Sequence, residues 1–386
     1  MGNFGTVIIT GGSGFIGRHL VKKILESKCQ RVVVIDNLSN SSWNDFIRFL
    51  AADDQSLFKL SRPDRDKEIA TARMTFYRMD VRDYDDIERV FETEIEREKE
   101  NEKEKDIGGD LNACIHLAAK ISVPESAIRP EETMDVNVRG TNNVIKCARK
   151  FGIQYCVFAS SAAVYGIPSK LPISELEVPN PISKYGESKL EAENVLARYS
   201  KELRRVISLR LFNLYGIGQT MEYAGVITRF MDRIKRNLPP EIYGNGLQTR
   251  DFINVDDVVD AMMRAAGLVK IQENETTTSA TVTASPKSSE TETGTLKHTL
   301  PQAICKSGVY NIGTGIPTKI KDLAHVMTDI LVHNEDQKSR LNLRPIYLEP
   351  VEGDIYESYA DISKARHSLG FVPSSSLRCG LKDILL

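Results

Sequence analysis

Residues 6–17, Thr-Val-Ile-Ile-Thr-Gly-Gly-Ser-Gly-Phe-Ile-Gly, decide the fold of this chain. The first five residues form a β-branched run, and the glycines at positions 11, 14 and 17 open an amphipathic stretch that continues to residue 25. This order predicts a strand, a tight turn and a helix. A glycine turn in that place lets the backbone approach a pyrophosphate and points a helix N-terminus at its charge, so we expect a bound dinucleotide.

Asp36 strengthens that expectation, because the G-x-x-G-x-x-G spacing alone fits a tight structural turn equally well. The carboxylate lies 19 residues past Gly17, after the apolar run at 32–35, where it can bind the ribose hydroxyls of adenosine. It would repel a 2′-phosphate, and no Arg follows within the next few residues, so NAD is favoured over NADP. The structural alternative is a turn cap for residues 37–39.

Apolar runs recur along the chain at intervals typical of alternating strands and helices. Strands are expected over residues 32–35, 75–79, 113–117, 155–159 and 206–211, and helices over residues 84–97, 133–151 and 185–202. The first of these strands reads Val-Val-Val-Ile, and a strand that is apolar on both faces is typical of a parallel sheet. We therefore expect an α/β fold, a Rossmann-type doubly wound parallel sheet with a smaller C-terminal α/β substrate lobe.

The length of 386 residues favours two lobes over one. We expect an NAD-binding Rossmann domain over residues 1–182, to which segments near 206–216 and 250–268 return. A substrate-binding lobe is expected over residues 183–386.

Three insertions interrupt this plan. Residues 41–73 carry scattered aromatic side chains and could form a helical insertion. Residues 92–106 have mixed charges at helical spacing, which predicts a solvated helix extension. Residues 272–299 are rich in Thr, Ser and Glu with few large apolar side chains, so we expect a disordered loop there.

Composition excludes several classes of protein. Lys and Arg total 51 against 53 Asp and Glu, so the overall charge does not indicate a nucleic-acid partner. The six cysteines have no short paired spacing, which favours reduced thiols over a disulfide frame or a zinc site. No apolar stretch approaches the roughly 20 residues that cross a bilayer, and no signal-type leader precedes the first strand. We expect a cytoplasmic protein with no metal.

Tyr185 and Lys189 are the clearest candidates for chemistry. They lie four residues apart, which places a phenol and an ammonium on one face of the expected helix. An unperturbed Tyr has a pKa of about 10. A cation within reach stabilises the phenolate, so we expect the hydroxyl to act as a base near neutral pH. A base beside a nicotinamide implies the oxidation of an alcohol.

Further motifs appear in a fixed order around this pair. They are His116-Leu117-Ala118-Ala119, Asn137-Val138-Arg139-Gly140-Thr141 and Ser160-Ser161-Ala162-Ala163-Val164-Tyr165-Gly166. Together with the glycine run, Asp80 and Tyr185-Gly-Glu-Ser-Lys189, they closely resemble the extended short-chain dehydrogenase/reductase family. Within it the chain resembles the NAD-dependent nucleotide-sugar epimerases and dehydratases, especially the UDP-glucose 4-epimerase type. The resemblance covers nearly the whole chain outside the three insertions.

The resemblance implies a role for each matching residue. Tyr185 would be the acid/base, Lys189 would tune it and bind the nicotinamide ribose, and Ser161 would hydrogen-bond the reacting oxygen rather than merely satisfy a strand end. The NAD cofactor would contact Gly11, Gly14, Phe15, Ile16, Gly17, Asp36, Asn37, Asp80, Val81, Leu117, Ala118, Ala119, Tyr185 and Lys189. The nucleotide sugar would contact Ser122, Ser161, Tyr185, Asn213, Arg250 and Ser358. His116 is interpreted as core or cofactor packing, not as a base.

Four residues either depart from the family pattern or distinguish one member of the family from another. Val351 stands where relatives usually have an Arg that binds the diphosphate, a role that Arg344 could take over. Ala162 and Ala163 replace the Asp-Glu pair that sugar 4,6-dehydratases use, so elimination of water is not expected. Ser358 falls where some epimerases have a bulky Tyr, and a small residue there leaves room for an N-acetyl group.

The implied function is NAD-dependent 4-epimerisation of a UDP-hexose through a 4-keto intermediate. UDP-glucose and UDP-galactose are the expected substrates, with their N-acetyl forms as an extension. Two alternatives stay open: another NAD-dependent nucleotide-sugar oxidoreductase, and a scaffold that binds NAD or a nucleotide sugar without catalysis. A homodimer formed through a helix pair is the assembly that the family implies.

Overall fold

A parallel sheet forms the centre of the molecule. The computed structural model describes residues 4–27, 31–51, 68–70, 73–105, 111–219, 225–269, 306–332, 343–351 and 353–386. Within them the sheet has the order β11-β7-β6-β5-β1-β2-β4-β3. Its parallel strands are β1 (Phe4–Thr10), β2 (Arg31–Ile35), β4 (Met74–Tyr77), β5 (Leu111–His116), β6 (Tyr155–Ser161), β7 (Arg205–Leu211) and β11 (Gly308–Ile312). The short strand β3 (Glu68–Ala70) pairs antiparallel with β4 at the edge.

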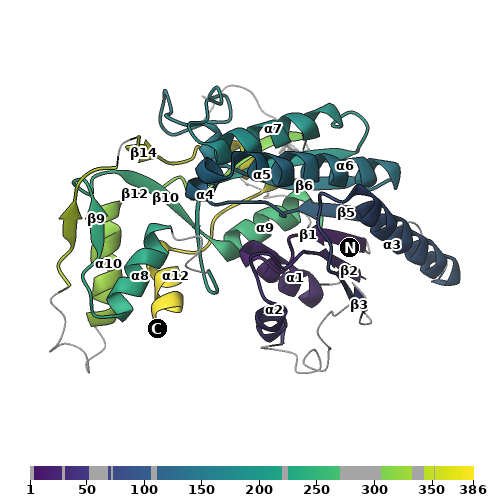
Figure 1. Cartoon of the computed structure of the whole chain (residues 1–386), viewed down its shortest axis with the longest axis horizontal. Helices are drawn as coiled ribbons and strands as arrows, with labels where there is room; N and C mark the ends of the chain where they lie inside the picture. Colours follow the sequence, from purple (N-terminus) through teal and green to yellow (C-terminus); the bar gives the residue numbers. More distant parts are fainter. Residues whose placement is uncertain are drawn as a thin grey trace, which may run out of the picture.

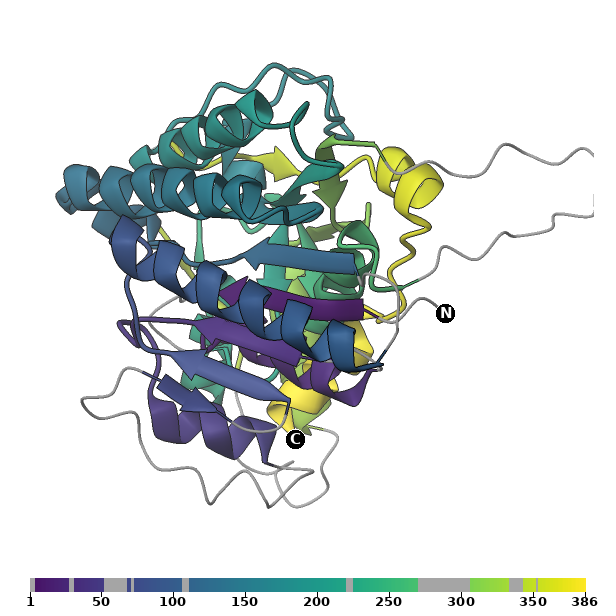
Figure 2. The same cartoon turned by 90° about the vertical axis from the view of Figure 1, so that its right-hand side faces the viewer.

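Helices cover both faces of this sheet (Figures 1 and 2). Alternate residues of β1 point to opposite sides, so Val7 and Ile9 belong to one apolar core and Ile8 to the other. The first core is closed by α1 (Phe15–Glu26), α2 (Trp43–Leu50), α9 (Val255–Ala265) and α11 (Ser363–Leu369). The second is closed by α3 (Tyr84–Lys105), α6 (Gly140–Lys150) and α7 (Lys184–Arg198). The sheet is therefore doubly wound, as the sequence predicts.

A smaller group of elements lies beside the sheet, at the left in Figure 1. Strand β10 (Thr249–Asn254) is flanked by β12 (Pro317–Lys319), β14 (Glu357–Ser358) and β8 (Asn213–Tyr215), while β9 (Glu241–Tyr243) pairs with β13 (Ile346–Leu348). Helices α8 (Val226–Lys235), α10 (Ile320–Val332) and α12 (Leu377–Leu385) share a separate apolar core with these strands. This is the smaller C-terminal α/β lobe.

Asp251 on β10 ties the lobe to the large sheet. Its side chain is fully buried and accepts hydrogen bonds from the backbone N–H groups of Thr314 at 2.8 Å, Gly315 at 2.9 Å and Ala360 at 3.1 Å. A Cβ on Gly313 would lie 2.5 Å from Asp251 Oδ2, so only glycine allows this approach. One carboxylate thus joins β10 to the turn that follows β11 and to the segment before α11.

The predicted element bounds need small changes. Strand β4 ends at Tyr77, two residues before the predicted end, and α7 ends at Arg198. The helical insertion within 41–73 is confirmed by α2, whereas residues 52–67 and 71–72 lie outside the described residues. The predicted disordered loop at 272–299 also lies outside them. The domain boundary after residue 182 stays a prediction, and α7 and β11, which follow it, belong to the large sheet and its helices.

The solvated extension predicted for residues 92–106 is wrong in its first half. Helix α3 does continue to Lys105, but Glu94 and Glu98 are buried. Glu94 accepts hydrogen bonds from Arg31 Nε at 2.7 Å and from the hydroxyl of Tyr77 at 2.6 Å. A buried carboxylate is stable when it is paired and hydrogen-bonded in this way.

Among the residues that the structure describes, no helix is both long and apolar enough to cross a bilayer.

Candidate active site

The glycine turn forms one wall of the site. Gly11 follows β1 with φ +71°, and a Cβ there would lie 2.6 Å from the backbone nitrogen of Ala118. A Cβ on Gly17 would lie 2.3 Å from the carbonyl oxygen of Gly11, which keeps α1 close to the turn. Gly14 is the N-cap of α1, and its cap has no side-chain hydrogen bond. The first amides of the helix are thus available to an anion such as a pyrophosphate.

A pocket of about 430 Å³ opens in front of this turn. It brings together every residue that the sequence assigns to the cofactor, and it also contains Ser161 and Asn213. Most of these residues stand at or just beyond the carboxyl ends of β1, β2, β4, β5, β6 and β7, the usual ligand position in an open parallel sheet. The residues of the chain therefore fit a dinucleotide.

Asp36 is oriented by backbone groups. Its Oδ2 accepts a hydrogen bond from the N–H of Ser13 at 3.0 Å, and its Oδ1 accepts one from the N–H of Leu38 at 2.8 Å. Withdrawal from water raises the pKa of the carboxyl group, while the hydrogen bonds from Ser13 and Leu38 oppose the rise. The predicted turn cap is therefore real, and the same carboxylate also lines the pocket.

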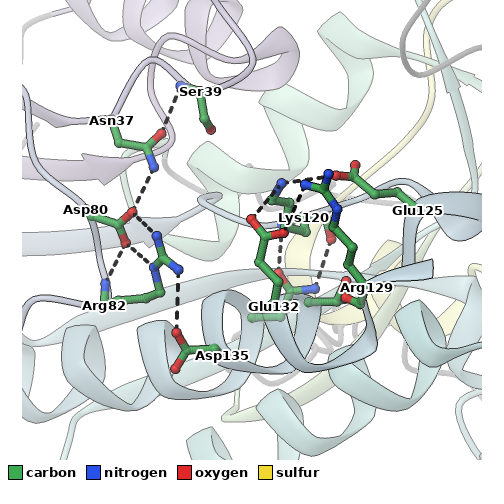
Figure 3. Close-up of polar contacts among 11 residues, drawn as sticks. Asn37, Ser39, Asp80, Arg82, Lys120, Glu125, Arg129, Glu132 and Asp135 are labelled. Atoms are coloured by element: carbon green, nitrogen blue, oxygen red, sulfur yellow. Dashed lines mark hydrogen bonds and ion pairs between the residues drawn. The ribbon is translucent and has the colours of Figure 1, made fainter. Parts of the chain in front are cut away.

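The residues beside Asp36 form a polar cluster that Figure 3 shows. Asn37 Nδ2 donates to Asp80 Oδ2 at 2.9 Å, and Arg82 donates to both oxygens of Asp80 at 3.0 and 2.9 Å. Burial opposes ionisation of Asp80, but the bonds from Arg82 and Asn37 outweigh it and lower the pKa to about 2. Arg82 also lies 3.5 Å from Asp135. Sequence reasoning missed Arg82. Asp80 and Asp135 neutralise its charge, so Arg82 does not favour the 2′-phosphate of NADP, and the preference for NAD is unchanged.

A second cluster in Figure 3 was also missed. Lys120 Nζ lies 3.2 Å from Glu125 Oε1 and 3.1 Å from Glu132 Oε1, and these ion pairs raise the pKa of Lys120 against the effect of burial. Asn137 holds the backbone of Lys120 through bonds of 2.7 and 2.9 Å to its N–H and C=O groups. Lys120 and Glu132 line the pocket. The position of Asn137 in a quoted motif was the only signal in the sequence.

Helix α7 carries the proposed acid/base into the site. Ser183 caps the helix by accepting a hydrogen bond from the N–H of Gly186 at 3.1 Å. A Cβ on Gly186 would lie 2.6 Å from the carbonyl oxygen of Ala163, so a glycine lets α7 touch the 3₁₀ turn that follows β6. Tyr185, at the start of α7, and Ser161, at the end of β6, line the same pocket.

The electrostatics of Tyr185 differ from the sequence-based expectation. Burial raises the pKa of the phenol, and the hydrogen bond with Ser161 only opposes the rise. Lys189 Nζ lies 6.0 Å from the centre of the Tyr185 ring and donates to the carbonyl oxygen of Ala159 at 2.9 Å. Burial also lowers the pKa of Lys189 to about 7, against the effect of Glu193. Helical spacing predicts that Tyr185 and Lys189 lie close together, but loss of hydration decides the direction in which the pKa of Tyr185 moves.

His116 packs in the core beside the site, as expected. It is buried, with its two ring nitrogens against the hydroxyls of Thr10 and Thr141, and its ring stacks on Phe158 at a centroid distance of 5.6 Å. Burial lowers its pKa to about 3, with a smaller contribution from the charge of Lys189. A neutral imidazole of this kind is a poor base near pH 7.

The residues predicted to bind substrate are not all in the pocket. Asn213 lines it, whereas Ser122, Arg250 and Ser358 do not. Ser122 caps α4 (Val123–Ile128) by accepting a hydrogen bond from Glu125 N. Arg250 faces Ser358 across β10 and β14, and its Nη2 lies 2.6 Å from Asp354 Oδ1. Their substrate roles stay predictions.

The unusual Val351 is exposed, as is Arg344. Neither residue lines the pocket. That Arg344 takes over the diphosphate-binding role of the Arg found in relatives therefore stays a prediction. In the described part of the chain, no group of three or more His, Cys, Asp and Glu side chains is arranged to hold a metal ion.

Comparisons with known proteins agree with this geometry. Residues 7–277 match the model of the NAD dependent epimerase/dehydratase family. A putative UDP-glucose 4-epimerase of Methanocaldococcus jannaschii is 31% identical over 98% of this chain and 97% of its own length. The structure is similar to a UDP-glucose 4-epimerase of Thermotoga maritima solved with UDP-glucose, with TM-score 0.71, 28% identity and coverage of 98% and 97%. It is also similar to a UDP-N-acetylglucosamine 4-epimerase of Methanobrevibacter ruminantium in complex with UDP-N-acetylmuramic acid, with TM-score 0.73, 25% identity and coverage of 100% and 98%.

Proposed function

Because this chain belongs to the NAD-dependent epimerase/dehydratase family, we propose that it interconverts the C4 epimers of a UDP-hexose. The observation that carries the proposal is the meeting of Ser161, Tyr185 and Lys189 in the pocket that the glycine turn and Asp36 also line. A positioned hydroxyl and a general base beside a dinucleotide site are what the oxidation of a sugar alcohol needs.

The side chains divide the work of the reaction. Tyr185 removes the proton of the C4 hydroxyl as the carbonyl group forms, and returns a proton when the carbonyl group is reduced. Ser161 donates a hydrogen bond to the reacting oxygen and fixes its distance from Tyr185. Lys189 supplies positive charge to the phenolate and to the nicotinamide ribose. When bound, NAD⁺ accepts the hydride of C4 and supplies it again for the return step, so no external oxidant is consumed.

Epimerisation is favoured over dehydration by the residues that follow Ser161. Elimination of water needs a further acid and base close to the sugar, and the 3₁₀ turn Ala162–Val164 offers only apolar side chains there. The 4-keto sugar would therefore be reduced again rather than dehydrated, and reduction from the opposite face would give the C4 epimer. Epimerisation and dehydration share their first oxidation step, and the side chains of this 3₁₀ turn determine whether water can then be eliminated.

We propose UDP-glucose and UDP-galactose as substrates, with the N-acetyl forms in addition. The similar proteins of known structure include one solved with UDP-glucose and one described as a UDP-N-acetylglucosamine 4-epimerase, which supports a UDP-sugar. Ser358, opposite Arg250 in the β10–β14 pair, supports the larger N-acetyl group because a small side chain leaves space.

A panel of UDP-, dTDP- and GDP-sugars screened for inversion at C4 tests the proposal. We expect conversion of UDP-glucose to UDP-galactose without added NADH and a loss of about 10²- to 10⁴-fold in turnover for Tyr185→Phe. Stoichiometric consumption of NAD(P)H would show a net oxidoreductase instead. Bound NAD with no conversion of any sugar would favour the scaffold, and wild-type turnover of Tyr185→Phe would contradict the mechanism.

A further inference from the structure

Glu193 lies on α7, one helical turn beyond Lys189, and is 6% exposed. Its Oε1 accepts hydrogen bonds from the hydroxyl of Ser160 and from Arg210 Nε at 3.0 Å. Its Oε2 accepts a bond from Arg210 Nη2 at 2.7 Å. One buried carboxylate therefore joins the helix that carries Tyr185 to the ends of β6 and β7.

Both partners of Glu193 stand next to residues of the site. Ser160 directly precedes Ser161 on β6, and Arg210 on β7 lies three residues before Asn213. The guanidinium of Arg210 also lies 4.7 Å above the ring of Tyr165, whose hydroxyl donates to Asn311 Oδ1 at 2.6 Å. The network thus crosses the three neighbouring strands β6, β7 and β11, and Ser160 is the member that lines the pocket.

The buried charges around Glu193 are unequal in number when Lys189 is protonated. Lys189 and Arg210 are 2% and 4% exposed and then carry two positive charges, against the single negative charge of Glu193. His116, which also interacts with Lys189, is neutral at pH 7 because its pKa is about 3. Ionisation of Tyr185 would balance the remaining positive charge. Without Glu193, two unpaired cations would share a water-poor interior, which is costly.

We propose that Glu193 is a positioning residue for the reaction: its carboxylate fixes the ends of β6 and β7 on α7 and balances the charge of Arg210, so that Lys189 can remain an ammonium. The proposal rests on the function proposed above. It adds a residue that touches neither the sugar nor the cofactor site, since Glu193 does not line the pocket.

The titration of Lys189 makes this role measurable. Burial lowers the pKa of Lys189 to about 7, and Glu193 is the group that raises it against burial. Loss of the negative charge must therefore lower the pKa further, and Lys189 would lose its proton at a lower pH. The other groups that face Lys189 are the ring of Phe158 at 4.7 Å, the ring of Tyr185 and His116. Neither Phe158 nor a neutral His116 can supply the missing charge.

Glu193→Gln tests the role of the charge, because glutamine keeps the shape and an oxygen acceptor. We expect the alkaline limb of the pH–rate profile to move down by about one pH unit. At pH 8 we expect turnover to fall up to about tenfold, with less change in the KM of the sugar. Glu94→Gln is the matched control, since Glu94 is a buried carboxylate paired with Arg31 and Arg97 on α3, away from the pocket. It should change thermal stability but not the profile.

Two further variants keep the test decisive if Glu193→Gln does not fold. Ser160→Ala removes one hydrogen bond from Glu193 and keeps the charge, so we expect turnover to fall a few-fold with the pH profile in place. Glu193→Asp keeps the charge on a shorter side chain and should restore the alkaline limb. A normal profile in Glu193→Gln, or equal losses in Glu193→Gln and Glu193→Asp without any pH shift, would reduce Glu193 to a structural ion pair and overturn the proposal.

Calorimetry of NAD⁺ binding separates this proposal from the function on which it rests. The affinity of Glu193→Gln for NAD⁺ should fall more at pH 8.5 than at pH 6.5 relative to the wild type, because the proposed contact of Lys189 with the nicotinamide ribose would be strongest when Lys189 is an ammonium. This measurement needs no sugar. If the wild type binds NAD⁺ but epimerises no nucleotide sugar, the proposed function fails, while an unchanged pH dependence of affinity in the variant would reject the role of Glu193.

Discussion

Replacement of Gly17 by alanine should weaken both the fold and the binding of NAD. The added Cβ would lie 2.3 Å from the carbonyl oxygen of Gly11 and 2.6 Å from Gly12 Cα. Both contacts are with backbone atoms, which cannot rotate away as a flexible side chain can. Helix α1 must therefore move outward by about 1 Å to reach ordinary contact distance.

The size of the effect follows from these contacts. Overpacking of a well-packed site costs about 1–3 kcal/mol. The same displacement moves the N-terminus of α1 from the place where its first amides would meet a pyrophosphate. We expect the Kd for NAD⁺ to rise at least tenfold, which corresponds to about 1.4 kcal/mol.

Urea unfolding and calorimetric titration with NAD⁺ measure the two effects separately. Gly225→Ala is the control, because a Cβ at Gly225, the N-cap of α8, meets no atom within 4 Å and the residue also lines the pocket. The free energy of unfolding of Gly225→Ala should fall by only about a few tenths of a kcal/mol. If Gly17→Ala binds NAD⁺ as tightly as the wild type, the close approach of α1 to the turn does not form the cofactor site.

Three further changes test other parts of the site. Arg250→Lys keeps the charge but loses the fork that lies 2.6 Å from Asp354, so the KM for the nucleotide sugar should rise about tenfold with little change in kcat; an unchanged KM in steady-state assays would exclude Arg250 from the substrate site. Ser358→Tyr should lower kcat/KM for UDP-N-acetylglucosamine ~10-fold or more relative to UDP-glucose, and equal losses for both sugars would show that Ser358 does not distinguish the N-acetyl group. Lys189→Met should abolish activity yet raise the free energy of unfolding at pH 6 by about 1–2 kcal/mol, because folding then no longer buries the ammonium of Lys189. Since the pKa of Lys189 is lowered to about 7 in the folded state, wild-type stability rises above that pH and the difference should shrink at pH 9 in urea unfolding; an advantage that persists there would refute this explanation.

The parts of the fold that the sequence predicts well are local. The glycine turn, Asp36 and the helix that carries Tyr185 and Lys189 each depend on residues that are close together in the chain. Neighbouring positions therefore determine whether a strand, a turn or one helix face is formed. The pocket in the structure brings these segments together as expected.

The features that the sequence does not predict depend on contacts between residues that are far apart in the chain. Arg210 and Ser160 meet Glu193 from two different strands, and no spacing in the chain indicates that contact. The pKa of Tyr185 has the unexpected direction because its sign depends on desolvation, which helical spacing does not report. The charge pattern of α3 predicts a solvated Glu94, because it does not show which glutamates of the helix are buried.

The bonds of Asp251 also constrain how the molecule can move. A carboxylate with no exposure that holds Thr314, Gly315 and Ala360 would have to give up these bonds before β10 could rotate away from the end of β11. An unpaired buried carboxylate is far more costly than a surface contact. A hinge between the lobe and the sheet is therefore disfavoured at this point, and we expect ligand entry to depend on small rearrangements at the rim of the pocket.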